Sequence, residues 1–159
     1  MNDKTQQRKS HGIPFNRNAQ YARCVNELVV CSECEKPRVM YAARKVHFRD
    51  IEYPKTKLEM AIYMWGSSLQ DLCGPEDPVM SRIFVRVNLS CSDPVEIPYY
   101  SSEAFVDLCI HCGIAQDLAT GKTDIYLMCA TCLREHPKLY KWKCSCVAGP
   151  GQKRRASII

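Results

Sequence analysis

Three C-x-x-C pairs constrain this chain more than any other feature of its sequence. They are the pairs Cys31/Cys34, Cys109/Cys112 and Cys129/Cys132. Such a turn lets two thiolates reach one tetrahedral metal ion, and paired turns are typical of structural zinc sites. The chain holds eleven cysteines in all, and an odd number leaves at least one cysteine unpaired in a disulfide framework. The cysteine pattern therefore favours metal binding over disulfides.

The N-terminal segment bears on the same choice, because thiols stay reduced only in some compartments. Residues 1–20 are polar and lack the apolar stretch of a secretory signal. The sequence also has no run of about 18 apolar residues, so we expect no membrane-spanning helix. We therefore expect an intracellular protein, in the nucleus rather than the cytoplasm, in which clustered cysteines bind metal.

The second and third pairs make the strongest constellation. Sixteen residues separate Cys112 from Cys129, and two pairs at such a spacing are typical of a four-thiolate zinc site. Residues 133–135 can open a helix, so the third pair would lie at a helix start. Free backbone N–H groups there can donate hydrogen bonds to the thiolates. We expect one zinc ion bound by these two pairs.

The first pair needs two further ligands. We expect Cys73 and Cys91 to supply them, because Cys73 follows a predicted helix and Cys91 ends a predicted strand. Both cysteines would then lie at the ends of elements, where separate segments can share one ion. The ligands predicted for two zinc ions are Cys31, Cys34, Cys73, Cys91, Cys109, Cys112, Cys129 and Cys132.

Two other ligand arrangements stay open. In one, Cys144 and Cys146 complete the site of the first pair. In the other, a cross-brace, the first pair shares an ion with the third pair, and the second pair shares one with Cys144 and Cys146. The sequential scheme leaves Cys24, Cys144 and Cys146 without a role, and a third metal ion bound by them is also open.

The hydrophobic pattern predicts short elements around these sites. A hairpin over 28–44 would carry the first cysteine pair at its tip. The main helix is predicted over 55–70, because apolar residues recur there at helical spacing and Pro54 precedes them. Alternation of apolar residues predicts a strand over 83–89, and a further strand over 125–128 leads into the third pair.

These features predict a small α+β fold stabilised by zinc, with two sites of treble-clef or zinc-ribbon type, short hairpins and one main amphipathic helix. We expect a flexible basic arm over 1–23, a zinc-binding domain over 24–147 and a disordered basic tail over 148–159. Within the domain, the first site would span 28–91 and the second 105–140.

The predicted sites argue against an enzyme. Four thiolates saturate a zinc ion, whereas a catalytic zinc keeps one position for water or substrate. The sequence has no H-E-x-x-H, no P-loop and no G-x-G-x-x-G. It also lacks the H-x-E and P-C-x-x-C pair of zinc deaminases. We therefore expect no catalytic activity and no small-molecule substrate.

Three motifs carry a resemblance to known proteins. They are CSECEKPRVMYA over 31–42, CSDPVE over 91–96 and C-x-x-C-G over 109–113. Over residues 25–140 the chain resembles cysteine-rich zinc-binding modules of uncharacterised invertebrate proteins, some of them linked to mobile elements. The resemblance implies two groups of four cysteines, divided as in the sequential scheme, and implies no activity. Glu35 stands where such a knuckle more usually has glycine.

The charge distribution indicates where a partner could bind. The formal net charge is +5, but eight thiolates and two Zn²⁺ ions would bring it to about +1. Residues 1–24 carry five Lys or Arg against one acidic residue, and residues 134–159 carry seven against one. The middle, 25–133, carries ten against fifteen. We therefore expect a structural zinc module that binds DNA or RNA through basic flanks. The alternative is a protein–protein interaction adaptor with an acidic body.

Overall fold

The computed structural model describes residues 11–74, 77–119, 125–136 and 139–141, and these residues form only short elements. In chain order they are α1 (Ala19–Arg23), β1 (Leu28–Val30), β2 (Pro37–Val39), β3 (Tyr41–Ala42), α2 (Phe48–Met60), α3 (Leu69–Cys73), the 3-10 turn η1 (Met80–Arg82), β4 (Ile83–Phe84), α4 (Ile97–Ser101), β5 (Leu118–Ala119), β6 (Met128–Cys129) and α5 (Ala130–Glu135). The fold is therefore small and α+β, as the sequence predicts. None of the helices described is long and apolar enough to cross a membrane.

Three predicted features lie wholly or partly in residues that the structure does not describe. The predicted tail over 148–159 lies outside the described residues, and so do Cys144 and Cys146. The first ten residues of the predicted arm lie outside them as well.

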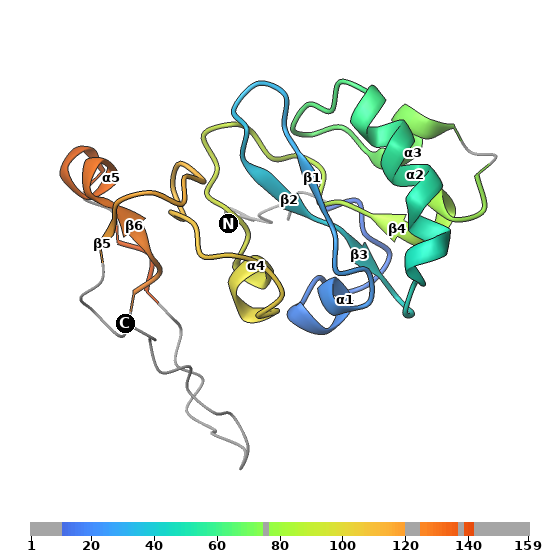
Figure 1. Cartoon of the computed structure of the whole chain (residues 1–159), viewed down its shortest axis with the longest axis horizontal. Coiled ribbons are helices and arrows are strands. Elements are labelled where there is room, and N and C mark those ends of the chain that lie inside the picture. Colours follow the sequence, from blue (N-terminus) through green and yellow to red (C-terminus); the bar gives the residue numbers. More distant parts are fainter. Residues whose placement is uncertain (1–10, 75–76, 120–124, 137–138, 142–159) are drawn as a thin grey trace, which may run out of the picture.

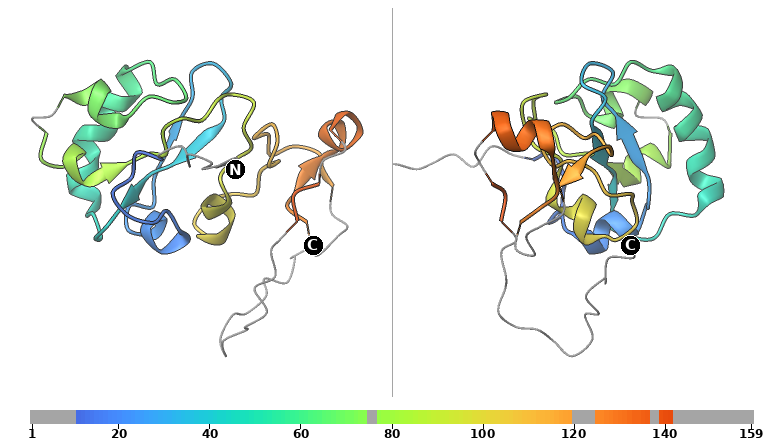
Figure 2. Two further views of the ribbon diagram at one scale, coloured as in Figure 1. Left: turned by 180° about the vertical axis from the view of Figure 1, so that it is seen from behind. Right: turned by 60° about the vertical axis from the view of Figure 1, so that its left-hand side comes forward.

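The strands of the described residues pair into three separate two-stranded antiparallel sheets. β1 pairs with β2, with Leu28 opposite Val39, so the hairpin predicted over 28–44 is confirmed over 28–39 only, with the first cysteine pair in its turn; Tyr41 and Ala42 pair with β4 instead. β3 pairs with β4, and β5 pairs with β6. The β1–β2 hairpin lies between α2 and α3 on one side and the β5, β6 and α5 unit on the other (Figure 1, Figure 2).

Two hydrophobic clusters share the β2–β3 segment. Val39 and Tyr41 belong to the cluster that also contains the cysteines of the second and third pairs. Met40 and Ala42 belong to the other cluster, which packs against α2 and α3. Successive strand residues point to opposite faces, so the predicted alternation is correct. Both faces are buried here, because each is covered by a different part of the chain.

The main helix differs from its prediction over 55–70. α2 begins earlier, contains Pro54 and ends at Met60, and the helix resumes only at α3. Between them the Tyr63 carbonyl accepts hydrogen bonds from the backbone N–H of Ser32, at 2.9 Å, and from its hydroxyl, at 2.8 Å. This pairing holds residues 61–68 against the hairpin turn. Tertiary contacts therefore override the helical spacing of the apolar residues.

The predicted strand over 83–89 is shorter than expected. β4 ends at Phe84, although Ile83 and Val85 are both buried, as alternation requires. Farther on, the Val87 N–H donates to the carbonyl of His11 at 3.0 Å. The strand ends early because Val87 pairs with His11 and not with a further residue of β3.

Residues 11–23 do not form a flexible arm, which corrects the N-terminal part of the predicted division. Ile13 is buried and Ala22 is fully inaccessible in the first hydrophobic cluster. Asn18 caps α1 by accepting a hydrogen bond from the Tyr21 N–H at 3.2 Å. The segment is polar overall, but its few apolar residues lie at positions that reach the core. The average hydrophobicity of the segment does not reveal these buried residues.

Candidate metal centres

The structure brings together the four cysteines of the second and third pairs. The Sγ atoms of Cys109, Cys112, Cys129 and Cys132 all lie within 4.8 Å of one another. The Cys112 and Cys129 sulfurs are 3.7 Å apart. Zn–S bonds of about 2.3 Å place the sulfurs of a tetrahedral site about 3.8 Å apart. This group, the second centre below, therefore has dimensions that suit one four-coordinate metal ion.

Local backbone structure shapes the second centre. The Gly113 N–H donates to the Cys109 carbonyl at 2.8 Å, which closes the first turn, and Gly113 has a φ of +76°. Such a left-handed conformation favours glycine. β6 delivers Cys129, which caps α5: its sulfur accepts the Cys132 N–H at 3.4 Å. The prediction that the third pair lies at a helix start, with a sulfur bonded to a free N–H, is confirmed.

The pKa of the Cys109 thiol is lowered, which favours its ionised form. Burial opposes its charged form, but backbone N–H groups of Cys112, Cys129 and His111 outweigh burial and lower its pKa to about 7. Metal-bound cysteine is a thiolate, so the same N–H groups would stabilise the ligand form.

The first centre gathers three cysteines from distant segments. The Sγ atoms of Cys31, Cys34 and Cys91 lie within 4.8 Å of one another, and those of Cys31 and Cys91 are 3.9 Å apart. The first two lie in the β1–β2 turn, and Cys91 lies 60 residues after Cys31. The sulfur spacing again matches the edge of a zinc–thiolate tetrahedron, which is about 3.8 Å.

The turn of the first centre parallels that of the second. The Glu35 N–H donates to the Cys31 carbonyl at 2.9 Å, and Glu35 has a φ of +56°. Burial opposes ionisation of Cys31, but backbone N–H groups of Cys34, Glu33 and Trp65 lower its pKa. Each turn thus offers its first cysteine several backbone donors. Glu35 takes the left-handed conformation that Gly113 takes in the other turn.

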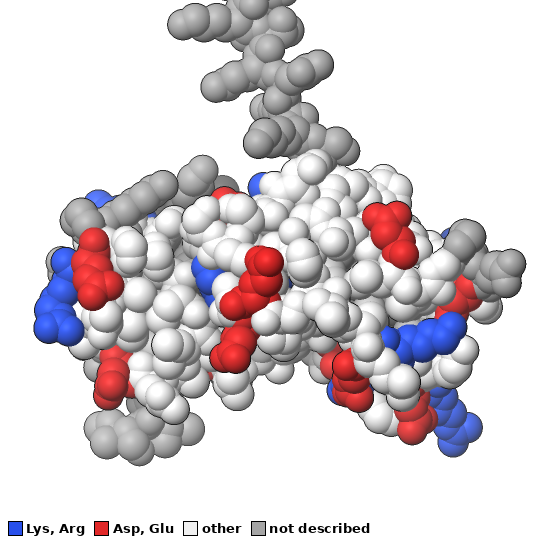
Figure 3. Space-filling model, turned by 90° about the horizontal axis from the view of Figure 1, so that it is seen from above, with Lys and Arg blue, Asp and Glu red and all other residues white. Residues whose placement is uncertain are grey.

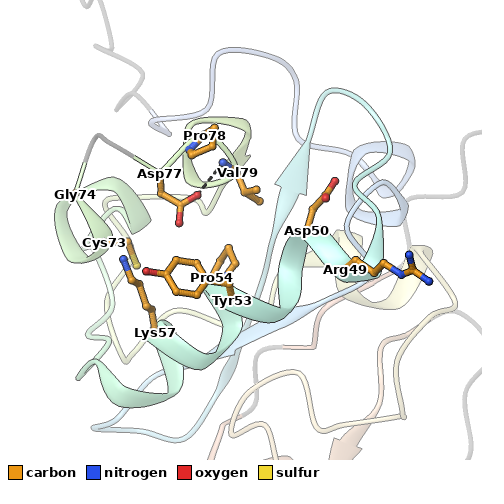
Figure 4. Close-up of a pocket in the computed structure, with 10 residues that line it drawn as sticks. All are labelled: Arg49, Asp50, Tyr53, Pro54, Lys57, Cys73, Gly74, Asp77, Pro78 and Val79. Carbon is orange, nitrogen blue, oxygen red and sulfur yellow. Dashed lines mark hydrogen bonds between the residues drawn. The ribbon is translucent and has the colours of Figure 1, made fainter.

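Cys73 is not brought to the first centre. It ends α3 and lines an open pocket beside Tyr53 and Lys57 of α2 (Figure 4). Burial raises the pKa of its thiol. Both Cys73 and Cys91 follow predicted elements, and sequence spacing alone could not decide which of them folds back to the hairpin turn. Cys24 also lies outside both centres and packs against the second hydrophobic cluster.

A carboxylate lies beside the three cysteines. The Cys91 thiol donates to Glu33 Oε2 at 3.3 Å. Carboxylate oxygen, like sulfur and imidazole nitrogen, is a ligand type that zinc binds in proteins. Nothing in the spacing indicated this residue, because Glu33 occupies one of the variable positions inside its C-x-x-C motif.

Two basic side chains are buried next to the first centre. The Lys36 ammonium donates to the carbonyls of Asp93 and His111, at 2.9 and 3.0 Å. The Arg38 guanidinium carbon lies 3.0 Å from the centre of the Trp65 ring. Burial lowers the pKa of Lys36, while the thiols of the surrounding cysteines oppose that change. Nothing in the sequence singled out either residue, because lysine and arginine are usually exposed.

Comparisons with known proteins supply no relative for this chain: no family model matches it, and neither a curated protein nor a solved structure does so significantly. The assignment of function therefore rests on the two cysteine centres.

Proposed function

We propose that this protein is a non-enzymatic, structural zinc-binding module that holds one Zn²⁺ ion in each centre. The four mutually close sulfurs of the second centre carry the proposal. A tetrahedral set of thiolates is the preferred environment of zinc, and it leaves no position for a substrate. A metal ion bound at such a site cross-links segments of the chain.

The fold around the second centre supports a treble-clef or zinc-ribbon type of site. Its ligands come from a tight turn, from the end of β6 and from the first turn of α5. The β5–β6 pair places Leu118 opposite Cys129, so a short hairpin precedes the helix. Turn, hairpin and helix start are the parts that such sites combine.

Metal content provides the direct test. Native mass spectrometry of the full chain should show two zinc ions. Cys34→Ser and Cys112→Ser should each remove one ion, and Cys73→Ser, as the matched control, should remove none. Recovery of metal-free protein with oxidised cysteines would rule the proposal out.

The finer part of the proposal is that the module associates with DNA or RNA through its flanks. Residues 134–159 contain seven basic residues and one acidic residue. A segment with such an excess of positive charge can neutralise phosphates. On the face shown in Figure 3, the Lys and Arg side chains of the described residues are scattered and interspersed with Asp and Glu. That face carries no continuous basic patch. A nuclear location would accompany this role.

Salt dependence tests the nucleic-acid role. Binding of the full chain to single- and double-stranded oligonucleotides should weaken steeply between low and moderate salt. Replacing Lys153, Arg154 and Arg155 by Ser should reduce both the affinity and the salt slope. Affinity that is unchanged by salt and by this variant would contradict the proposal.

Exposed apolar residues favour a protein-interaction adaptor as the second candidate. Phe48 and Met60 at the two ends of α2 are 70% and 83% exposed, and Ile62 is 75% exposed. Large exposed apolar side chains are common at protein interfaces. A partner that binds the tail-substituted variant as tightly as the native chain, and loses affinity on Met60→Ser, would favour this reading.

A further inference from the structure

Lys36 lies at the junction of the two metal centres. It follows Cys34 by two residues, yet it is only 5% exposed. Its ammonium bonds the carbonyl of Asp93, two residues after Cys91, and the carbonyl of His111, inside the turn of the second centre. One side chain from the first turn is therefore hydrogen-bonded to ligand-bearing loops of both centres.

The surroundings of Lys36 fit this side chain closely. A Cβ atom added at Gly113 would lie 2.8 Å from Lys36 Cγ, so the turn of the second centre rests directly on the lysine stem. The ammonium also lies 4.8 Å from the centre of the Trp65 ring. Burying an ammonium is costly unless its donors are satisfied, and here two carbonyls and an aromatic face receive it.

Once metal is bound, the Lys36 ammonium also interacts electrostatically with both centres. Four thiolates around one Zn²⁺ carry a net charge of −2, and three carry −1. An ammonium between two anionic centres attracts both and offsets their mutual repulsion. Removing either centre would take away part of the environment that keeps Lys36 buried.

We propose that Lys36 couples the two metal centres, so that zinc bound at one centre raises the zinc affinity of the other. This inference rests on the proposed function, since it requires that both centres bind zinc. Metal at the second centre fixes the turn that carries the His111 carbonyl. That carbonyl in turn holds Lys36, and with it the adjoining turn of Cys34 and the loop after Cys91. Linkage requires the effect to be reciprocal.

A double-mutant cycle on the full chain tests the coupling. Zinc affinity of the first centre is measured by competition with a chromophoric chelator in Cys112→Ser and in the native chain, each with Lys36 or with Lys36→Met. Loss of the second centre should weaken the first about tenfold when Lys36 is present, which is a typical coupling. With Lys36→Met the same loss should have little effect. Lys55→Met, which removes an ion pair to Glu27 of 3.4 Å, is the matched control and should leave the coupling unchanged.

The possible results separate this inference from the proposed function. A native chain that binds no zinc overturns the function itself. Two bound ions with no effect of Cys112→Ser on the first centre, or with an equal effect in both lysine backgrounds, overturn the coupling alone. The coupling is supported only if the weakening depends on Lys36.

A second measurement leaves position 36 unchanged and therefore does not depend on whether Lys36→Met folds. In zinc-loaded native protein, Lys36 should resist an amine-reactive acetylating reagent while Lys55 reacts, as read by peptide mass spectrometry. In Cys112→Ser, with zinc still at the first centre, Lys36 should become reactive. Continued protection of Lys36 in that variant would overturn the coupling.

Discussion

Glu35 holds a backbone conformation that most residues avoid. Its φ of +56° lies in the left-handed region, which costs a non-glycine residue roughly 1–2 kcal/mol. The equivalent place in the second centre is taken by Gly113. The first turn therefore tolerates a strain that the second avoids, and its ligands must hold it in place.

Replacing Glu35 by glycine should relieve this strain. We expect Glu35→Gly to raise the thermal midpoint of the zinc-loaded protein by about 2–4 °C, which corresponds to about 1 kcal/mol in a chain of this size. The matched control is Glu35→Ala, which removes the charge but keeps the strain and should change the midpoint little. Equal midpoints for the glycine and alanine variants would show that the turn is not strained.

Glu33 is a candidate fourth ligand of the first centre, because its carboxylate accepts a hydrogen bond from the Cys91 thiol at 3.3 Å. If its carboxylate is the fourth ligand, Glu33→Gln should lower the zinc affinity of the first centre by about tenfold or more and leave the second centre unchanged. Chelator competition measures both affinities. The double variant Cys144→Ser/Cys146→Ser should then have no effect. The reverse result would assign the fourth position to the C-terminal cysteines.

Among the elements, β2 and the segment that leads into α4 are joined by a buried ion pair. Arg38 is fully inaccessible, and its Nη1 lies 3.9 Å from Glu96 Oε2. Glu96 also accepts hydrogen bonds from the Val39 N–H at 3.2 Å and the Tyr41 hydroxyl at 3.0 Å. Burial raises the pKa of Glu96, although Arg38 opposes that change. The carboxylate therefore depends on its partners for its charge.

Removing Arg38 should destabilise the protein strongly. Arg38→Met leaves the buried Glu96 with the partly exposed Arg17, 3.8 Å away, as its remaining cationic partner, and we expect a loss of about 3 kcal/mol in unfolding free energy, measured by urea denaturation. The double variant Arg38→Met/Glu96→Gln should recover part of that loss. Arg82→Met is the control, because Arg82 is half exposed and its 3.6 Å pair with Asp50 lies at the surface. That variant should cost less than about 1 kcal/mol, and an equal cost for both arginines would contradict the argument.

The elements also mark where sequence reasoning reached its limit. The β1–β2 hairpin and the start of α5 were predictable, because alternation and a C-x-x-C turn are local signals. The break between α2 and α3 was not, because it depends on a hydrogen bond from Ser32 to the carbonyl of Tyr63, thirty-one residues away. The same reason explains the misplaced Cys73, whereas the second centre has all its ligands within one short stretch.

In the whole molecule, the sheets are too small to be stable by themselves. Each has only two strands among the described residues, and an isolated two-stranded sheet is marginal in water. Four cysteines of the second centre line a hydrophobic cluster or pack against it. The second metal centre and the first hydrophobic cluster therefore share residues, and each should depend on the other for its stability.

Removing zinc should accordingly unfold the described body of the protein. A strong chelator with a thiol reductant should abolish the cooperative thermal transition and most of the helical circular dichroism, and zinc should restore both. Magnesium added in place of zinc serves as the control and should restore neither, because it prefers oxygen ligands. A chelated protein that kept a cooperative transition would show that the apolar clusters suffice.

The first centre joins Cys31 to a cysteine 60 residues later. During translation this separation delays assembly of the centre. Ribosomes add roughly 5–20 residues each second, so the first turn emerges roughly 3–12 s before Cys91 can meet it. Throughout that interval the nascent chain presents two thiols without their partners. A cell making this protein would have to protect them from oxidation until the later cysteine arrives.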